Sequence, residues 1–280
     1  MYLAHFGLSE LPFGITPDTS FAFSAAAHQE ALNTLLVAAR SGEGFIKITG
    51  EVGTGKTLLC RSFLAALDER YASAYIPNPY LEPRTLLLAL AEELGAPLKN
   101  DGDQYHLLKS IGLALLNFAR QGKAVLLCLD EAQAMPLETL ESLRLLSNLE
   151  TEKRKLLQIV LFGQPELDDK LANPAIRQLR QRIAFSYRLR GLRRGEVGLY
   201  VAHRLRVAGY RGDRLFAPAA IRRLHGASGG TPRLVNILSH KAMLAAFGEG
   251  RQQVDAAHVQ SAVGDTEGVR PPRWAFWRAG

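Results

Sequence analysis

Short apolar runs alternate with longer stretches of helical spacing through the first two thirds of the chain. These short runs predict strands at 45–49, 74–76, 124–129, 156–162 and 183–189, of which those at 45–49 and 124–129 are expected to be buried. The stretches with helical spacing predict helices at 28–40, 58–70, 83–94, 104–120, 137–149 and 174–182. Because strands that alternate with helices form parallel sheets covered on both faces, the pattern predicts an α/β domain with a five-stranded parallel sheet flanked by helices.

The pattern changes at Arg193, after which only helical spacing remains. We expect helices near 194–208, 218–225, 232–247 and 256–263, and a hinge at Gly191. Residues 1–26 are rich in Phe, Pro and Gly and show neither a helical nor a strand period. They predict an irregular arm that packs on the domain through its aromatic rings. The predicted organisation is an arm (1–26), an α/β domain (27–191), a small all-α lid domain (192–265) and a basic aromatic tail (266–280).

The loop between the first predicted strand and its helix contains a phosphate-binding pattern. Its sequence is Gly50-Glu51-Val52-Gly53-Thr54-Gly55-Lys56-Thr57, followed by Leu58. Glycines let backbone N–H groups approach an anion, and the start of a helix adds its positive dipole end. In this context Lys56 is expected to reach the β- and γ-phosphates of ATP, and the Thr57 hydroxyl to bind Mg²⁺. An ordinary glycine-rich turn is the alternative.

Two carboxylates directly follow the apolar run 124–129. Asp130 and Glu131 are therefore predicted at the carboxyl end of a central strand, which is the edge where parallel sheets bind ligands. We expect Asp130 to hold Mg²⁺, directly or through water, and Glu131 to orient and polarise the attacking water. The alternative is a strand that ends in exposed acids, and the upstream loop argues against it.

Two further positions have both a functional and an ordinary interpretation. Gln164 follows the strand 156–162, where it either senses the γ-phosphate or caps a turn. Arg233 lies in the first turn of the helix that begins after Gly229-Gly230-Thr231. An arginine is electrostatically unfavourable at a helix start, which favours a functional role slightly over a solvated one.

Charge and cysteine content add limits. The net charge is +7, but residues 1–170 carry 15 Lys and Arg against 21 Asp and Glu, whereas residues 171–280 carry 19 against 6. The basic C-terminal part can face nucleic acid, an anionic membrane, an acidic partner or solvent, and charge alone does not choose. Cys60 and Cys128 fit buried thiols in a reducing compartment better than a disulfide or a metal pair.

The expected location is cytoplasmic. The N-terminus lacks a basic region followed by an apolar run, and no apolar run approaches the ~18 residues of a membrane-spanning helix. Near the C-terminus, Trp274 and Trp277 are flanked by arginines, which suits peripheral contact with the inner membrane. A pocket on a membrane-bound partner suits them equally, and packing on the tail's own domain is the third interpretation.

Together these motifs resemble those of AAA+ ATPases, from the phosphate loop to the Gly-Thr-Pro-Arg helix start. Other stretches narrow the resemblance to the general secretion pathway protein A group: Tyr2-Leu3, Phe6-Gly7-Leu8, Pro12-Phe13, Thr16-Pro17-Asp18, Phe21, His28, Glu30-Ala31-Leu32, Asp130-Glu131-Ala132-Gln133 and Gly163-Gln164-Pro165-Glu166-Leu167. Longer secretion members continue into a membrane span and a periplasmic domain. The chain ends at Gly280, so we expect it to be most similar to the shorter ATPases of MSHA-type pilus biogenesis.

The resemblance implies a role for each matching residue of the nucleotide site. Lys56 and Thr57 take the phosphate and Mg²⁺ roles, Asp130 holds the metal, and Glu131 is the catalytic base. ATP and Mg²⁺ are thus the implied cofactors.

The resemblance also implies residues that report or trigger hydrolysis. Gln164 matches the first sensor position, where relatives often have Asn, Ser or Thr, and Arg233 matches the second sensor. Arg182 stands where the family places an arginine finger that acts on a neighbouring subunit, with Arg180 as the runner-up. Asn78 corresponds to a polar residue that restrains the base. A finger acting between subunits implies a homo-oligomeric ring, such as a hexamer.

Two classes of function stay open at this point. The resemblance implies an ATPase that supports assembly of a bacterial envelope machine, a type IV or MSHA-like pilus or a type II secretion system, through a membrane-bound assembly protein. A DNA-associated AAA+ regulator of the transposition or replication-initiation type is the alternative. Nucleic acid is less favoured, because the sequence shows no added helix-turn-helix, zinc module or long basic arm. A degenerate nucleotide-binding scaffold is the third option, which the intact Glu131 disfavours.

Overall fold

The computed structural model describes residues 2–16, 18–97, 103–151, 154–267 and 269. They form two compact units. The α/β unit comprises residues His28–Glu51 and Leu59–Leu189. The helical unit comprises residues within Met1–Ala27, Val52–Leu58 and Arg190–Gly280.

The α/β unit is built on one sheet of five strands. These are β1 (Phe45–Gly50), β2 (Tyr71–Ile76), β3 (Ala124–Leu129), β6 (Leu157–Gly163) and β7 (Ile183–Leu189). Their order is β2-β3-β6-β1-β7, and every neighbouring pair is parallel. The five-stranded parallel sheet predicted from the sequence is thus confirmed. All seven residues of the central strand β6 are buried, as expected of a strand covered on both faces.

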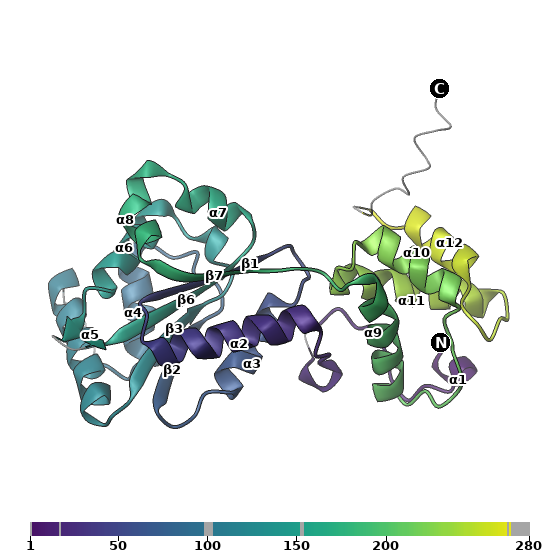
Figure 1. Ribbon diagram of the computed structural model, residues 1–280, viewed down its shortest axis with the longest axis horizontal. Coiled ribbons are helices and arrows are strands. Elements are labelled where there is room, and N and C mark those ends of the chain that lie inside the picture. The colour runs from purple at the N-terminus through teal and green to yellow at the C-terminus, as the bar shows by residue number, and fades with distance from the viewer. Residues whose placement is uncertain (1, 17, 98–102, 152–153, 268, 270–280) are drawn as a thin grey trace. The chain divides into compact units, whose positions relative to one another are not determined.

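Helices cover both faces of this sheet (Figure 1). One face packs against α2 (Ala26–Ser41) and α3 (Lys56–Ala65), and Gln158 of β6 donates its amide to the Ala39 carbonyl of α2 at 3.1 Å. The opposite face packs into one apolar core with α4 (Pro83–Glu93), α5 (Gln104–Arg120), α6 (Leu137–Leu146), α7 (Glu166–Leu171) and α8 (Arg177–Gln181). This arrangement buries the inner strands β3, β6 and β1 between two helical layers, whereas the edge strands β2 and β7 are only partly buried.

Some short elements differ from the predicted pattern. The strands β4 (Glu150–Thr151) and β5 (Arg154–Lys155) form an antiparallel pair that the sequence did not predict, because two polar residues per strand leave no apolar alternation. The six-residue helix α7 was also not predicted. The helix predicted at 174–182 is divided into the 3-10 turn Pro174–Ile176 and α8.

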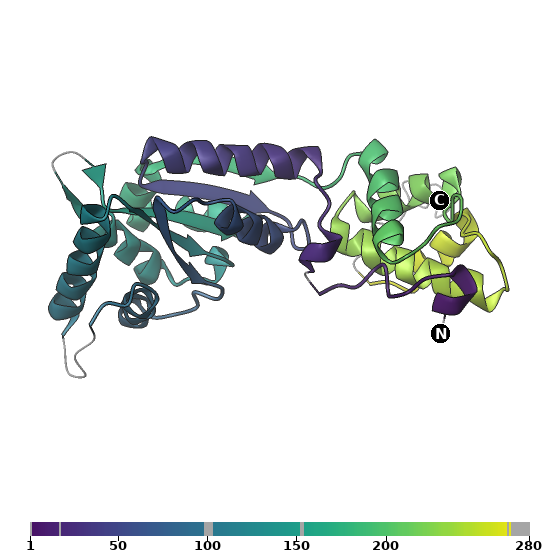
Figure 2. The same cartoon turned by 90° about the horizontal axis from the view of Figure 1, so that it is seen from below.

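Within the described residues, the helical unit contains four C-terminal α-helices and one short N-terminal α-helix. They are α1 (Leu3–Phe6), α9 (Arg194–Val207), α10 (Pro218–Ser228), α11 (Pro232–Gly248) and α12 (Ala256–Gly264). Aromatic residues of the N-terminal segment, among them Tyr2, Phe6 and Phe13, join the core of these helices. Both views show α1 beside them (Figures 1 and 2).

A buried arginine fixes the N-terminal segment to α9. The Arg204 side chain is 8% exposed, donates to the Pro12 carbonyl, and lies 4.6 Å from the centre of the Phe21 ring. A charge that is nearly buried needs such partners, since burial without them is costly. The aromatic arm predicted at 1–26 is therefore part of the helical unit's packing.

Gly191 lies against the glycine pair Gly229-Gly230, which precedes α11. A side chain at Gly191 would come within 2.9 Å of the Gly229 carbonyl oxygen, and the Leu192 N–H donates to the Gly230 carbonyl at 2.8 Å. The chain therefore passes closely by the turn before α11.

Both cysteines are free and buried, as expected from the sequence. A hydrogen bond with the Cys128 thiol, together with burial, raises the pKa of the Cys60 thiol. No group of three metal-ligating side chains occurs within the described ranges.

The tail predicted to contact a membrane or partner through Trp274 and Trp277 lies outside the described residues. Of the helices that the structure does describe, none has the length and apolar character needed to cross a membrane.

Candidate active site

The loop after β1 has the backbone of an anion-binding turn. Gly53 and Gly55 adopt φ angles of 79° and 95°, in the region that glycine enters without steric cost. Helix α3 begins directly afterwards at Lys56, whose residue is only 5% exposed. A nearly buried lysine beside the positive end of a helix is an arrangement that a bound anion stabilises. The residues therefore fit a phosphate group.

The order of the strands brings four predicted site residues to one edge of the sheet. Strand β6 lies between β3 and β1. Asp130 follows β3, Gln164 follows β6, and Gly50 ends β1. Since parallel strands end at the same edge, the two carboxylates, the glutamine and the start of the loop share this edge.

Asp130 is held in a buried position next to the end of β3. It is 2% exposed, and its Oδ1 accepts the backbone N–H of Glu131 at 3.0 Å. The Tyr75 hydroxyl lies 3.5 Å from Oδ2 of Asp130. Burial, followed by the negative charge of Asp130, raises the pKa of Tyr75 to about 12. Tyr75 therefore stays protonated at neutral pH and can act as a donor toward the carboxylate.

Glu131 has an unusual backbone conformation. Its φ of 55° is the single positive value at a non-glycine residue within the described residues. Such conformations cost roughly 1–3 kcal/mol and are concentrated at functional sites, where the surrounding contacts maintain them.

Two glutamines hold the side chain of Glu131. Its Oε2 accepts from the Gln133 amide at 2.5 Å and from the Gln164 amide at 3.1 Å. The two glutamines are joined to each other, because the Gln164 backbone N–H donates to the Gln133 Oε1 at 3.0 Å. Both amide groups donate to the same oxygen of the carboxyl group, so the other oxygen is available to accept from a water molecule.

The prediction that Asn78 restrains Glu131 is wrong in this structure, because the Glu131 side chain bonds to Gln133 and Gln164 and not to Asn78. The Asn78 carboxamide oxygen instead accepts from the Tyr80 backbone N–H at 3.3 Å. Gln133 supplies the contact, from within the same loop as Glu131. The difference arises because Asn78 forms a local turn after β2, which uses its side chain.

The two arginine-finger candidates have different surroundings. Arg182, at the end of α8, donates from Nη1 to the Ser147 hydroxyl after α6 and is partly buried. Arg180 is exposed on α8. Arg182 would have to leave Ser147 to reach another subunit, whereas Arg180 would not.

Arg233 and the phosphate loop segment Val52–Leu58 lie in the same compact unit. The Arg233 backbone N–H donates to the Gly53 carbonyl at 3.2 Å. A side chain at Gly53 would approach Cβ of Arg233 to 2.4 Å, so only glycine fits. The start of α11 thus packs directly on this segment.

Two residues near the site were not predicted to have a role. Gln133 is two residues after Glu131 in the Asp130-Glu131-Ala132-Gln133 stretch, so its closeness in sequence was a usable signal. Tyr75 is separated from Asp130 by 55 positions and meets it because β2 pairs with β3. Its neighbourhood could not be read from the sequence.

These features are similar to those of AAA domains. Residues 39–171 match the family model described as AAA domain, and the sheet order and C-terminal helices have the AAA+ fold. The chain is also homologous over its whole length to General secretion pathway protein A of Aeromonas hydrophila, with 41% identity over 280 residues. It covers 51% of that relative, and so spans about half of its length.

Solved structures support the fold. The ORC2 protein of Aeropyrum pernix, in ADPNP–ADP complexes, matches with a TM-score of 0.63 and 18% identity, covering 95% of this chain and 75% of that one. Cdc6p of Pyrobaculum aerophilum matches with a TM-score of 0.66 and 17% identity, covering 89% and 71%. The RuvB Holliday junction branch migration motor of Thermotoga maritima matches with a TM-score of 0.55 and 17% identity, covering 85% and 68%. At these identities the likeness concerns the fold alone.

Proposed function

We propose that this chain binds and hydrolyses ATP with Mg²⁺, and that the cycle supports assembly of a bacterial envelope machine. The observation that carries the ATPase proposal is that two strand ends, Gly50 of β1 and Asp130-Glu131 after β3, lie at one edge of the sheet, with Gln164 after the intervening β6 bonded to Glu131. An ordinary strand end does not need a strained glutamate held by two amides.

The proposed roles follow from the chemistry of the side chains. Lys56 binds the β- and γ-phosphates at the start of α3, and backbone N–H groups of Gly53–Lys56 bind their oxygens. Thr57 and Asp130 would hold Mg²⁺, which prefers hydroxyl and carboxylate oxygens and neutralises phosphate charge when bound. The remaining cofactor-binding residues, Gly50, Glu51, Val52 and Leu58, form the loop and its junction with the helix.

Glu131 would orient the attacking water, and Gln133 and Gln164 would set the direction of its carboxylate. Gln164, near the γ-phosphate, can respond to its loss. In this proposal the α/β domain (27–191) carries out hydrolysis, and the helical domain (192–265) responds to the nucleotide through Arg233.

The envelope role rests on the homology to General secretion pathway protein A, whose name assigns it to a secretion pathway. We propose a type II secretion system or a related type IV or MSHA-like pilus as the machine, with a membrane-bound assembly protein as partner. The protein would act on the cytoplasmic side of the inner membrane. A DNA-associated regulator is the competing function, because the basic C-terminal part suits DNA as well as an acidic protein.

A pull-down with an ATP-trapped protein tests this role. Glu131→Gln protein loaded with ATP is expected to enrich secretion or pilus assembly proteins from the native membrane fraction, and Lys56→Ala protein is the matched control that cannot load. Retention on duplex DNA with a steep decrease at rising salt, together with no envelope protein in the pull-down, would favour the DNA function.

The proposed oligomer makes a prediction about concentration. If an arginine acts on a neighbour's nucleotide, the ATPase activity per subunit rises with protein concentration. Loss of the finger is expected to reduce that activity by ~10³-fold, the scale of arginine fingers. We expect this loss in Arg182→Ala, and comparison with Arg180→Ala decides which arginine is the finger.

Arg177→Ala, an exposed arginine on the same helix, is the matched control and should retain activity. Mixing Arg182→Ala with Lys56→Ala is expected to restore part of the activity, because each subunit supplies what the other lacks. Activity per subunit that stays constant from dilute protein upward would contradict a finger acting between subunits.

A further inference from the structure

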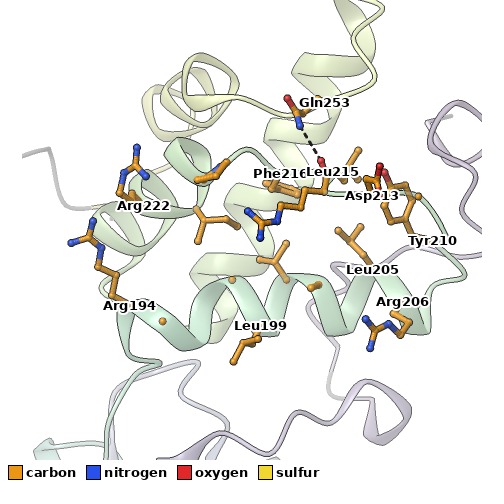
Figure 3. A pocket seen from close by; sticks show the side chains of 18 residues that line it. Arg194, Leu199, Leu205, Arg206, Tyr210, Asp213, Leu215, Phe216, Arg222 and Gln253 are labelled. Carbon is orange, nitrogen blue, oxygen red and sulfur yellow. Dashed lines mark hydrogen bonds between the residues drawn. The ribbon is translucent and has the colours of Figure 1, made fainter.

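The helical unit contains a groove that takes no part in the proposed nucleotide site. Its volume is about 1140 Å³, and it is formed by α9, α10 and the segment that joins them (Figure 3). The buried side chains of Leu205, Leu215 and Phe216 line it. The groove therefore offers an apolar surface already shaped by the packing of the unit.

The α9 side of this groove leaves room for another backbone. Gly195, Gly198 and Ala202 recur along α9 at helical spacing among the lining residues. A side chain added at Gly195 would meet nothing, and one at Gly198 would make an ordinary 3.5 Å contact with Ile221. Leu199, also lining the groove, is 64% exposed, more than any other large apolar residue described in this unit. Leu199 thus extends the apolar lining of Leu205, Leu215 and Phe216 toward solvent.

Arginines surround the apolar surface. Arg194 and Arg222 lie together at one end of the groove, and Arg206 lies at the other end (Figure 3). Arg214 also lines it, and all four are exposed. Within the described part of the chain none of them forms an ion pair. Asp213 is the single acidic residue of the lining.

We infer that this groove binds an acidic amphipathic helix of a partner protein. A helix with an apolar stripe can cover the surface between α9 and α10, as in other helix-in-groove complexes. Glutamate or aspartate at both ends of such a helix would meet the arginines at both ends of the groove, which gives orientation and electrostatic steering. This interaction is separate from nucleotide binding and goes beyond the ATPase proposal.

Charge argues against two other occupants. The last eleven residues of the chain's own tail, 270–280, contain Arg270, Arg273 and Arg278 and no acidic residue, so the groove's arginines would repel them. A nucleic acid would satisfy the arginines but leave the apolar residues without matching contacts, because its backbone is a chain of charged phosphates. An acidic amphipathic helix matches both components.

Peptide binding tests the inference on the full chain. The probe is a fluorescent peptide of about 18 residues with Leu at helical spacing and Glu elsewhere. Its controls are a scrambled sequence and a version with Lys in place of Glu. We expect fluorescence anisotropy to show saturable binding of the Glu peptide alone, weakened by rising salt.

Two variants locate the binding surface. Ala202→Glu fills the groove and adds a repelling charge, and Arg206→Glu/Arg214→Glu reverses the charge of its edge. Each is expected to weaken binding at least tenfold. Arg211→Glu/Arg251→Glu is the matched control, since both residues are exposed on the same unit and neither lines the groove. Melting curves verify that the variants fold, which exposed positions should tolerate.

Several outcomes would overturn the inference. If the scrambled or Lys peptide binds as tightly as the Glu peptide, the groove does not recognise leucines at helical spacing combined with acidic residues. If Arg211→Glu/Arg251→Glu weakens peptide binding equally, the loss of binding results from the change in net charge and not from the groove. If the Glu peptide does not bind, the groove has no such partner. If duplex DNA displaces the peptide, the partner is nucleic acid. If Ala202→Glu abolishes self-association of the protein, the partner is a second copy of the chain.

Discussion

Glu131→Gln protein is expected to bind ATP with the affinity of the parent and to hydrolyse it ~10²-fold or more slowly, the scale of a positioned general base. Glutamine has nearly the same shape as glutamate, so the contacts with Gln133 and Gln164 can largely persist. It lacks the negative charge that polarises a water molecule. Steady-state phosphate release and titration with a fluorescent ATP analogue separate the two effects.

Glu138→Gln is the matched control for this experiment, because Glu138 is an exposed acid in the first turn of α6. It should hydrolyse ATP at the parent rate. If Glu131→Gln protein also turns over at the parent rate, the assignment of Glu131 as the base is wrong. If it loses binding as well as turnover, Glu131 acts on the nucleotide and not only on the water.

Lys56→Ala protein is expected to lose nucleotide binding. Lys56 is almost buried at the start of α3, and it is the cation of the loop that we assign to the β- and γ-phosphates. Two charge-assisted hydrogen bonds of ~1.5–3 kcal/mol each correspond to a loss of affinity of ~10²-fold or more. Isothermal titration with Mg-ATP measures the change directly.

The increase in melting temperature on adding Mg-ATP provides an independent measure, because a ligand that binds only the folded state stabilises it. This increase should disappear in Lys56→Ala and persist in Lys109→Ala, which removes an exposed lysine of α5. If Lys56→Ala protein binds Mg-ATP with the affinity of the parent, the loop is an ordinary glycine-rich turn and does not bind phosphate through Lys56.

Several features of this protein were determined by contiguous stretches of its sequence. The mostly apolar runs located the five sheet strands, and the inner strands β3 and β6 are the most apolar because helices cover both of their faces. The pattern from Gly50 to Thr57 identified the anion-binding loop, because the glycines, the lysine and the following helix are all local. Asp130 and Glu131 were located at the edge of the sheet for the same reason, as they directly follow β3.

Only the tertiary structure decided which distant residues meet. The strand order inserts β6 between β3 and β1, and this brings Gln164 to Glu131 across 33 positions. The N-terminal aromatics gave no period, and the structure assigns them to the core of the helical unit. The groove is likewise lined by residues that are distant in the sequence, from α9, from the segment 210–222 and from Gln253. Such contacts depend on how whole elements pack, whereas the periodicity of a segment reports only which of its own faces is buried.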